Sequence, residues 1–455
     1  MSRAIRILAC AFVLILGFSQ AVPSPTTAKP VVYPCDGPCH GGHHLPPSKI
    51  QYIIVIVQEN RTPDNLFQGL PGADIASSGT NSMGKTVTLV PRKLATAYDL
   101  DHSHAGWKTE YARGAMNGWD LEKSTCPSGK CLPQTAFAYV PKKDVKPYFT
   151  MAQTYTFADK TFQDNQGPSF PAHQFIIAGT STDAVGSKLL AAENLMYHSG
   201  TWQSGANCGG SPLDRVKMID AAGDETATRP PCFEHPTIMD LLDSAKISWR
   251  YYNAASSGFW SAPDAIKHMR YGPQWNNVIV PETTILTDIK KGQLPHVSWV
   301  TPSPAESDHS VSTNGSGPAY VASIVNAVGA SKYWNSTAIF ITWDDWGGWF
   351  DHVKPVIYSS YEVGFRVPLI VVSPYARKGY VSHVQHQQSS ILHYIETTFG
   401  LGTLGYADAR ADNLADCFNY MQSPTPYAYI PTPGWSARDL AQSAGPSNAP
   451  PDDDF

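Results

Sequence analysis

Continuous runs of apolar, mostly β-branched residues recur along the chain. Such a run is typical of a strand that is buried on both faces of a parallel sheet. Stretches with apolar residues at helical spacing lie between these runs. Strands interleaved with helices predict an α/β sandwich with a mostly parallel central sheet flanked by helices. The predicted strands are 52–57, 338–342 and 367–372, and the clearest predicted helices are 238–245, 320–328 and 390–399.

Two of the predicted strands end at acidic residues. Glu59 and Asn60 follow the first strand, and Asp344 and Asp345 follow the second. Ligands of open α/β sheets sit outside the carboxyl ends of strands, so both pairs arrive where a site is expected. Their hard oxygen donors suit a divalent ion such as Ca²⁺, Mg²⁺ or Mn²⁺. Taken alone, each pair has a structural alternative: the aspartates cap a turn at Gly347, and the first pair begins a loop.

A candidate nucleophile lies in the middle of the chain. Ser169 precedes Pro171, and a proline in this context marks the first turn of a helix. A serine at a helix N-terminus lies where backbone N–H groups and the helix dipole favour an anion such as phosphate. A metal beside the hydroxyl would lower its pKa and make it a nucleophile. The structural alternative is a serine that only caps the helix.

Two histidines lie in polar, loop-like stretches of the chain. His102 follows Asp101, and His309 follows Asp308. An imidazolium binds a phosphoryl oxygen or protonates a leaving alkoxide near neutral pH, so both are candidate catalytic residues. The structural alternative for each is a solvent-exposed histidine.

Composition narrows the classes of function. The 455 residues are 42% hydrophobic and 16% charged, with a net charge of -5. This globular composition has no basic surplus, so no nucleic-acid partner is expected. Residues 79–86 match the phosphate-binding-loop pattern letter for letter, but no buried strand precedes them and no helix follows, so nucleotide binding is rejected.

Both ends of the chain are expected to lie outside a catalytic domain at 49–440. Residues 1–21 combine a basic start, a short apolar run and small residues before Ala21, which predicts a cleavable signal peptide and a secreted or periplasmic protein. No apolar run is long enough for a bilayer span, so integral membrane association is not expected. Residues 22–48 form a Pro-, Cys- and His-rich leader, and 441–455 form a frayed tail.

Export also sets an expectation for the cysteines. Seven remain once the signal peptide is removed, and an oxidising compartment favours disulfides between neighbours in the sequence. Zinc binding by the Cys and His residues of the leader is the alternative for that segment. One thiol is left over. The expected pairs are Cys35/Cys39, Cys126/Cys131 and Cys208/Cys232.

Four stretches resemble the signature blocks of one family. The segment from Glu59 to Phe67 is similar to the E-N-R-T/S-F-D-N-x-F signature of the bacterial phosphoesterase family, which holds phospholipases C and secreted acid phosphatases. The resemblance runs from about residue 52 to about residue 401, with the blocks in the family's order. The later blocks are 167–169, 344–353 and 364–368.

The resemblance implies an alkaline-phosphatase-like α/β fold with one divalent ion and a hydroxyl nucleophile. Ser169 would attack phosphorus, His102 would bind a non-bridging oxygen, and His309 would act as the acid at the leaving group. His102 is preferred to His104 because it matches the family's D-x-x-H spacing. The implied metal ligands are Glu59, Asn60, Asp344, Asp345 and Ser169, and Asn60, His104 and His352 are implied in substrate binding or in support of these residues.

Three positions depart from the family pattern. Pro63 replaces the usual aromatic residue, which reshapes a turn. Asp345 stands where many relatives carry glutamate, so its reach to the ion is shorter. Ser310 follows His309 where proline is common.

Three functions compete on these residues. The preferred one is a metal-dependent acid phosphatase that hydrolyses small phosphate monoesters through a phosphoserine, because lipid-cleaving members of the family more often carry threonine at the nucleophile. The second is a phospholipase C that cleaves phospholipid headgroups, with Trp343, Trp346, Trp349 and Phe350 facing the lipid; packing is the alternative role of these rings. The third is a catalytically silent protein that keeps the fold.

Overall fold

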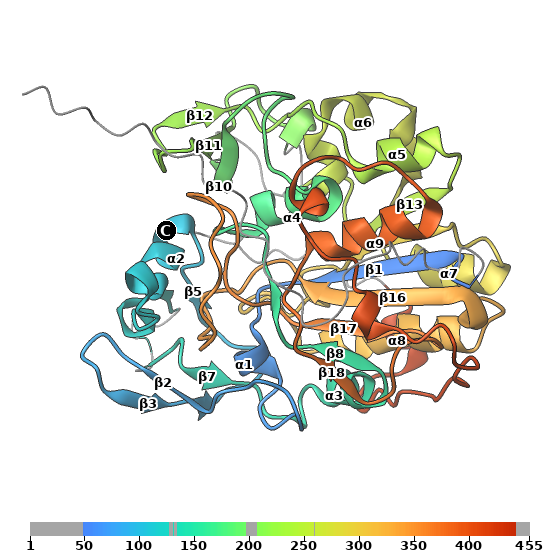
Figure 1. Cartoon of the computed structure of the whole chain (residues 1–455), viewed down its shortest axis with the longest axis horizontal. Coiled ribbons are helices and arrows are strands. Elements are labelled where there is room, and N and C mark those ends of the chain that lie inside the picture. Colours follow the sequence, from blue (N-terminus) through green and yellow to red (C-terminus); the bar gives the residue numbers. More distant parts are fainter. Residues whose placement is uncertain (1–48, 127–130, 132–133, 197–206, 259, 443–455) are drawn as a thin grey trace, which may run out of the picture. The chain divides into compact units, whose positions relative to one another are not determined.

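An eight-stranded sheet forms the centre of the protein in the computed structural model (Figure 1). The structure describes residues 49–126, 131, 134–196, 207–258 and 260–442, which belong to a compact unit that begins at His44. The strand order is β14-β13-β15-β1-β16-β17-β8-β18. The strands are β1 (Tyr52–Gln58), β8 (Thr156–Ala158), β13 (Trp249–Asn253), β14 (Val278–Ile279), β15 (Val297–Thr301), β16 (Thr337–Trp343), β17 (Leu369–Val372) and β18 (Tyr380–Ser382).

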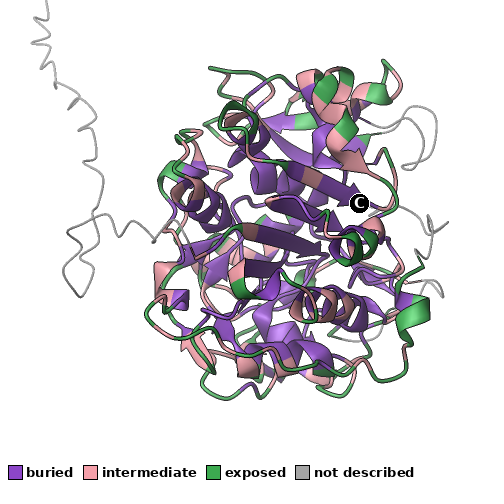
Figure 2. Cartoon of the chain, turned by 90° about the vertical axis from the view of Figure 1, so that its right-hand side faces the viewer, coloured by how far each residue is buried: buried purple, intermediate pink, exposed green. Residues whose placement is uncertain are grey.

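The two central strands, β1 and β16, confirm the interpretation of the apolar runs. They pair in parallel along their whole length, from Tyr52 opposite Thr337 to Gln58 opposite Trp343. Every residue of β16 is buried, and so is every residue of β1 after Tyr52. Figure 2 shows buried strands inside the protein, with the exposed residues mostly on loops and helices around them. The predicted α/β fold with a mostly parallel sheet is confirmed.

One strand runs against the prediction. β17 lies within the predicted run 367–372, but it is antiparallel to both β16 and β8, so the expected parallel direction is wrong. The described connection 344–368 contains no helix. A parallel return needs a crossover, usually helical, whereas a chain that turns back beside its own strand pairs antiparallel. The site-bearing loop after β16 replaces that crossover.

Two groups of helices flank the sheet (Figure 1). α4 packs against α5 and α9, and α8 packs against α3, α7 and α10. α5, α8 and α9 confirm the predicted helices. Within the described residues, no helix combines the length and the apolar character needed to cross a bilayer. The helices are α1 (Pro63–Leu66), α2 (His104–Tyr111), α3 (Lys146–Thr154), α4 (Ser169–Ala178), α5 (Ile238–Ser244), α6 (Lys267–Tyr271), α7 (Thr284–Lys291), α8 (Gly317–Gly329), α9 (Ser389–Phe399) and α10 (Ala437–Leu440).

Small sheets surround the central one and were not predicted. Most of their strands have two or three residues, too short to give an alternating pattern. The phosphate-loop look-alike at 79–86 belongs to the hairpin β2-β3, which agrees with its rejection. The strands are β2 (Ser78–Thr80), β3 (Thr86–Thr88), β4 (Val90–Pro91), β5 (Asp99–Leu100), β6 (Ser124–Thr125), β7 (Ala138–Tyr139), β9 (Thr161–Phe162), β10 (Leu190–Met196), β11 (Arg215–Ile219), β12 (Ala227–Arg229) and β19 (His386–Gln387).

The cysteines follow the expected pairing where the structure describes them. Disulfides join Cys126 to Cys131 and Cys208 to Cys232. Cys417 is a free, buried thiol. The predicted pair Cys35/Cys39, the signal peptide, the leader and the tail from residue 443 lie outside the described residues.

Candidate active site

The carboxyl ends of β1 and β16 bring four predicted ligands together. Because Gln58 and Trp343 are paired across parallel strands, the residues that follow them leave the sheet side by side. The Asn60 backbone N–H donates to Asp344 Oδ1 at 3.0 Å. Glu59, Asn60, Asp344 and Asp345 are all buried, so three carboxyl groups and one amide face one another away from bulk water.

The turn at Gly347 lies close to the loop that carries Asn60, and this close approach fixes the positions of Asn60 and Asp345. Gly347 has a φ of 63°, and a Cβ there would lie 2.5 Å from the Asn60 carbonyl oxygen. Its N–H donates to Asp345 Oδ1 at 2.7 Å, so Asp345 caps this turn as the structural alternative expected. Arg61 N–H donates to the Asp345 carbonyl oxygen at 3.0 Å. Only glycine fits at position 347 without moving the loop that carries Asn60.

Ser169 lies against the same carboxylates. Its hydroxyl oxygen is 3.2 Å from Glu59 Oε2 and 3.2 Å from Asp345 Oδ2. α4 begins at Ser169, with Pro168 in the capping position. The helix therefore begins where predicted, but the capping role is wrong, because the hydroxyl bonds to the carboxylates. Its position at the helix N-terminus puts backbone N–H groups beside an incoming anion.

His173 is a site residue to which sequence analysis gave no role. Its Nε2 lies 3.0 Å from Glu59 Oε1 and 3.8 Å from Asp344 Oδ2, and its side chain is fully buried. It follows Ser169 by four residues, so both project from one face of α4. The four-residue spacing from Ser169 is the sequence signal that could have identified His173 as a site residue.

The donor set fits a divalent cation. One end of the Asn60 side-chain amide lies 3.2 Å from Glu59 Oε2 and 3.3 Å from Asp344 Oδ1, and the other end lies 3.0 Å from His102 Nε2. With its oxygen toward the carboxylates, the amide gives a hard cation a third oxygen ligand, whereas with its nitrogen there it donates to both carboxylates and accepts from His102 Nε2. Among the described residues, none donates a hydrogen bond to the buried Asp344 Oδ2. The residues therefore fit the metal implied by the resemblance.

The two catalytic candidates His102 and His309 are brought together on the other side of Asn60. Their ring centroids lie 6.1 Å apart, and both are buried, so the alternative of solvent-exposed histidines is wrong. His102 Nδ1 donates to the Leu100 carbonyl oxygen at 2.7 Å, and the other ring nitrogen, Nε2, faces the Asn60 side-chain amide at 3.0 Å. His309 Nε2 lies 4.0 Å from Asp99 Oδ2.

His104 and His352 are held by other partners. His104 Nδ1 lies 2.6 Å from Glu225 Oε1. His352 bonds to Asp64 through Nδ1 at 2.8 Å and to Asp74 through Nε2 at 3.0 Å. That His104 and His352 support the candidate active site stays a prediction. Such support would act through the carboxylates to which they bond.

A buried hydrogen-bond network supports the segment that precedes His309. Arg61 Nε and Nη2 donate to the Asp308 carbonyl oxygen at 3.0 and 2.6 Å. Asp308 Oδ2 accepts from Tyr148 Oη at 2.9 Å and from Trp343 Nε1 at 3.0 Å. Burial raises the pKa of the Asp308 carboxyl to about 6 and lowers the pKa of Arg61 to about 10. The contacts join the segments after β1 and β15 to the last residue of β16 and to α3.

The aromatic residues around the metal loop pack inside the protein. Trp343, Trp346 and Trp349 are fully buried, and Phe350 is 2% exposed. Trp346, Trp349 and Phe350 belong to a core with Trp119. The packing role is therefore the one observed, and these rings do not face the solvent.

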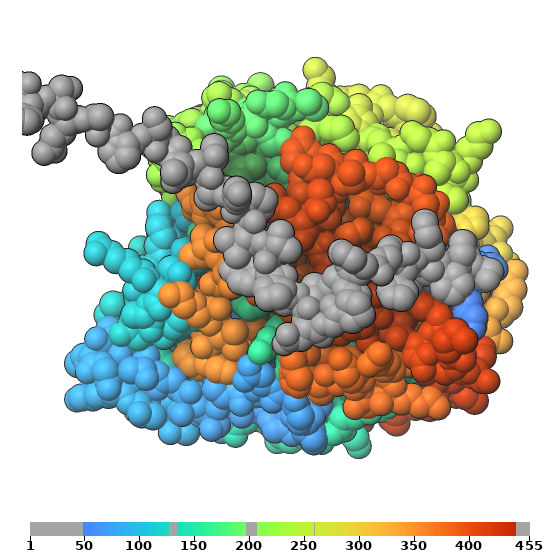
Figure 3. All heavy atoms as spheres, viewed as in Figure 1, coloured from blue at the N-terminus to red at the C-terminus, as the bar shows by residue number. Residues whose placement is uncertain are grey.

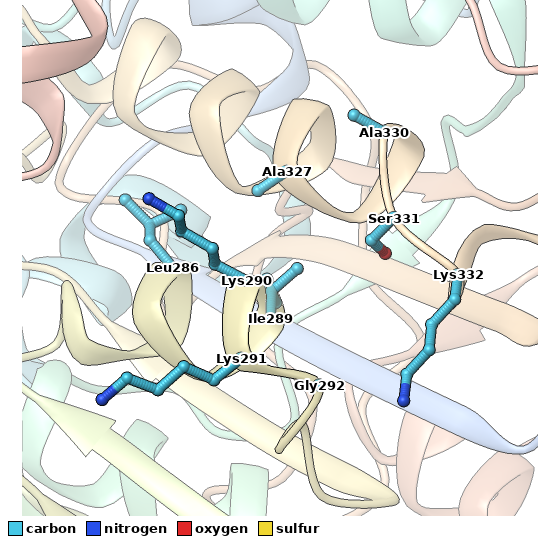
Figure 4. Close-up of a pocket in the computed structure, with 9 residues that line it drawn as sticks. All are labelled: Leu286, Ile289, Lys290, Lys291, Gly292, Ala327, Ala330, Ser331 and Lys332. Atoms are coloured by element: carbon cyan, nitrogen blue, oxygen red, sulfur yellow. The ribbon is translucent and has the colours of Figure 1, made fainter.

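A separate pocket of 650 Å³ lies between the C-terminal parts of α7 and α8 (Figure 4). Lys290, Lys291 and Lys332 line it, and Figure 4 shows their side chains directed apart. None of its nine lining residues is acidic or a histidine. The lining of this pocket therefore has none of the carboxylates and histidines that make up the buried cluster.

Known proteins are similar in sequence to this chain over most of its length. Phospholipase C B of Mycobacterium tuberculosis is 25% identical, over 86% of this chain and 81% of the relative. A non-hemolytic phospholipase C of Burkholderia pseudomallei is 23% identical, over 86% of this chain and 62% of the relative. A solved structure from Vibrio parahaemolyticus, described as a protein in the alkaline phosphatase superfamily, aligns over 83% of this chain and 74% of its own with a TM-score of 0.37 and 10% identity.

The family match covers the elements that build the site. The model of the phosphoesterase family matches residues 50–402, which include β1, α4, β16 and the loops that follow both strands. The segment is more than half of the chain and contains every candidate catalytic residue. This chain belongs to the phosphoesterase family.

Proposed function

We propose that this chain is a secreted phospholipase C-type enzyme that cleaves phosphodiesters by double displacement at Ser169. Membership of the phosphoesterase family makes it a hydrolase of phosphoric esters. The observation that carries the site is the Ser169 hydroxyl, 3.2 Å from two carboxylates at the start of α4. The relatives named above are phospholipases C, which supports the diester as substrate.

The metal would be held by Glu59, Asn60, Asp344, Asp345 and Ser169. When bound, a divalent ion lowers the pKa of a neighbouring hydroxyl and stabilises charge on a phosphoryl oxygen. The all-oxygen set favours Ca²⁺, Mg²⁺ or Mn²⁺, and His173 adds a nitrogen close to Glu59 and Asp344.

The protein's own groups divide the reaction between them. Ser169 Oγ loses its proton to a neighbouring carboxylate or to solvent and attacks phosphorus in line. Backbone N–H groups in the first turn of α4 stabilise charge on the phosphoryl oxygens. His102 holds a non-bridging oxygen, and His309 donates a proton to the leaving oxygen. Water then hydrolyses the phosphoserine ester, which restores Ser169.

Phosphate monoesters are the second candidate substrate, as the sequence analysis preferred. One observation favours them: the tryptophans of the metal loop are buried and packed, so they offer no apolar surface to a lipid. The family match is compatible with either ester, because it defines hydrolysis of a phosphoric ester and not whether the phosphorus carries one ester bond or two.

The two candidates separate in one assay. The purified protein is given p-nitrophenyl phosphorylcholine and p-nitrophenyl phosphate over a range of acidic to neutral pH, with and without a chelator. Faster, chelator-sensitive release from the choline diester supports the phospholipase C-type function. Release from the monoester alone would replace it by the phosphatase function, and no release from either, with metal bound, would favour a silent protein.

A further inference from the structure

A second group of metal-binding side chains lies outside the candidate active site. His386, Asp416 and Cys417 each offer one ligand atom, and these three atoms lie within 4.8 Å of one another. His386 is the first residue of β19, and Asp416 and Cys417 belong to the 3₁₀ turn Ala415–Cys417. The proposed phosphoesterase mechanism uses none of them.

The spacing of the three atoms fits one small ion. His386 Nε2 lies 3.5 Å from Asp416 Oδ1, and Cys417 Sγ lies 3.7 Å from the same oxygen. Tetrahedral zinc with bonds of about 2.0–2.3 Å separates its nitrogen, oxygen and sulfur ligands by roughly 3.3–3.7 Å. The two measured separations therefore match two edges of a tetrahedron.

A carboxylate outside the cluster orients the imidazole. Asp412 Oδ1 lies 2.8 Å from His386 Nδ1. Ser390 Oγ and the Leu414 backbone N–H donate to the Asp412 carboxylate at 2.6 and 2.9 Å, which fixes its position. Histidines that bind metals usually donate their other ring N–H to a carboxylate in this way. His386 is thus held with Nε2 turned toward Asp416 and Cys417.

The donor types and their exposure are suited to zinc. Imidazole, carboxylate and thiolate together form a donor set that zinc binds well and that Ca²⁺ and Mg²⁺ do not favour. The side chain of His386 is fully buried, whereas that of Asp416 is 25% exposed, so an ion can enter from the side of Asp416. Figure 3 shows orange and red segments from the C-terminal part of the described chain at the surface of this face of the molecule.

We propose that His386, Asp416 and Cys417 bind a zinc ion, with water in the fourth position. Binding releases the thiol proton of Cys417 and any proton on His386 Nε2. The two side chains then bind the ion as a thiolate and a neutral imidazole. The ion would join the turn that ends at Cys417 to β19 and stabilise this part of the fold. The competing arrangement is a protonated His386 between Asp412 and Asp416, with the Ser382 hydroxyl 3.0 Å from Nε2.

Cobalt substitution of the unmodified protein tests the site without any variant. Metal-free protein is titrated with Co²⁺, and a thiolate-to-cobalt charge-transfer band in the near ultraviolet is expected, because Cys417 is the free cysteine among the described residues. The candidate active site has no sulfur ligand among its residues and would not give this band. A titration without the band would overturn the proposal.

Variants then assign the ligands. Cys417→Ser and His386→Gln should each lower the bound zinc by one equivalent and remove the cobalt band. His383→Gln is the matched control, because His383 bonds to Asp159 and not to the cluster. Asp344→Asn should keep the band while it weakens metal binding at the candidate active site. An unchanged zinc content in folded Cys417→Ser protein would contradict the site whatever the outcome of the ester assays.

Asp412, which orients His386, should affect zinc binding less than the three proposed ligands do. Asp412→Asn should weaken zinc binding by about 10–100-fold and leave the thiolate band in place at saturating metal. An affinity equal to that of the unmodified protein would show that Asp412 does not position a metal-bound histidine.

Discussion

Ser169 Oγ lies 3.2 Å from Asp345 Oδ2, although the two residues are 176 positions apart in the sequence. The contact joins the N-terminus of α4 to the end of β16 and puts a hydroxyl against the buried carboxylates. A serine with only a capping role would direct its oxygen to the N–H groups of its own helix. The arrangement instead supports the proposed role of Ser169 as the nucleophile.

Removal of the nucleophile should abolish turnover. We expect Ser169→Ala to lower kcat by roughly 10³-fold or more, because no other group replaces the attacking oxygen. Metal content should stay close to that of the unmodified protein, since Glu59, Asn60 and Asp344 remain. Steady-state kinetics and metal analysis on the same preparation measure both. Ser169→Thr, which keeps a hydroxyl, is the control, and a near-normal rate for Ser169→Ala would refute its role.

Loss of one carboxylate should weaken metal binding at the candidate active site. Asp344→Asn removes a charge next to Glu59 and is expected to lower metal affinity by at least roughly tenfold and to make turnover depend on added metal. Asp120→Asn is a matched control, because Asp120 bonds to Ser82 in a surface loop. Titration with metal ions after chelator treatment measures the difference. Equal affinities in the two variants would count against the ligand assignment.

The turn at Gly347 should not tolerate a side chain. In Gly347→Ala the new Cβ would meet the Asn60 carbonyl oxygen at 2.5 Å, so the loop that carries Asn60 must move. Gly400→Ala is the matched control, because Gly400 has a φ of 64° and no atom lies within 4 Å of the position that a Cβ would take there. Backbone strain alone should cost about 1–2 kcal/mol in both. Gly347→Ala should lose more stability in urea unfolding and also lose metal affinity, whereas equal losses would argue against the clash.

His352 should make stability depend on alkaline pH. Burial disfavours its charged form, but the hydrogen bond and charge of Asp64 and the charge of Asp351 outweigh it and raise the pKa of His352 from 6.5 to about 9. Its contribution is therefore fully present below pH 6.5 and is lost as the pH rises through about 9. His352→Gln should have a lower Tm than the unmodified protein at acidic pH, with the difference closing on the alkaline side of 9. A constant difference would contradict the ion pair.

The sequence predicted the parts of the site that lie directly at the ends of apolar strand runs. The β-branched runs before Glu59 and Asp344 predicted two buried strands, and their parallel direction made the two ends meet. Pro171 similarly predicted that a helix begins near Ser169. These features depend on local propensity together with one general property of parallel sheets.

Other parts of the site depend on tertiary packing and could not be predicted locally. His173 contacts Glu59 only because α4 lies over the end of β1. The Arg61 guanidinium bonds to the carbonyl group of Asp308, 247 residues away, and no local pattern records that contact. The direction of β17 depends on a connection without a crossover, which apolar periodicity does not encode.

Trapping of the covalent intermediate tests the central claim most directly. The protein is mixed with p-nitrophenyl phosphate or its choline diester, quenched in acid and digested, and the peptide that contains Ser169 is analysed by mass spectrometry. We predict a phosphoryl or phosphorylcholine group on Ser169, present with substrate and absent from Ser169→Ala. Turnover with the modification on another residue, or with an unmodified Ser169 under conditions that trap the intermediate, would contradict the account.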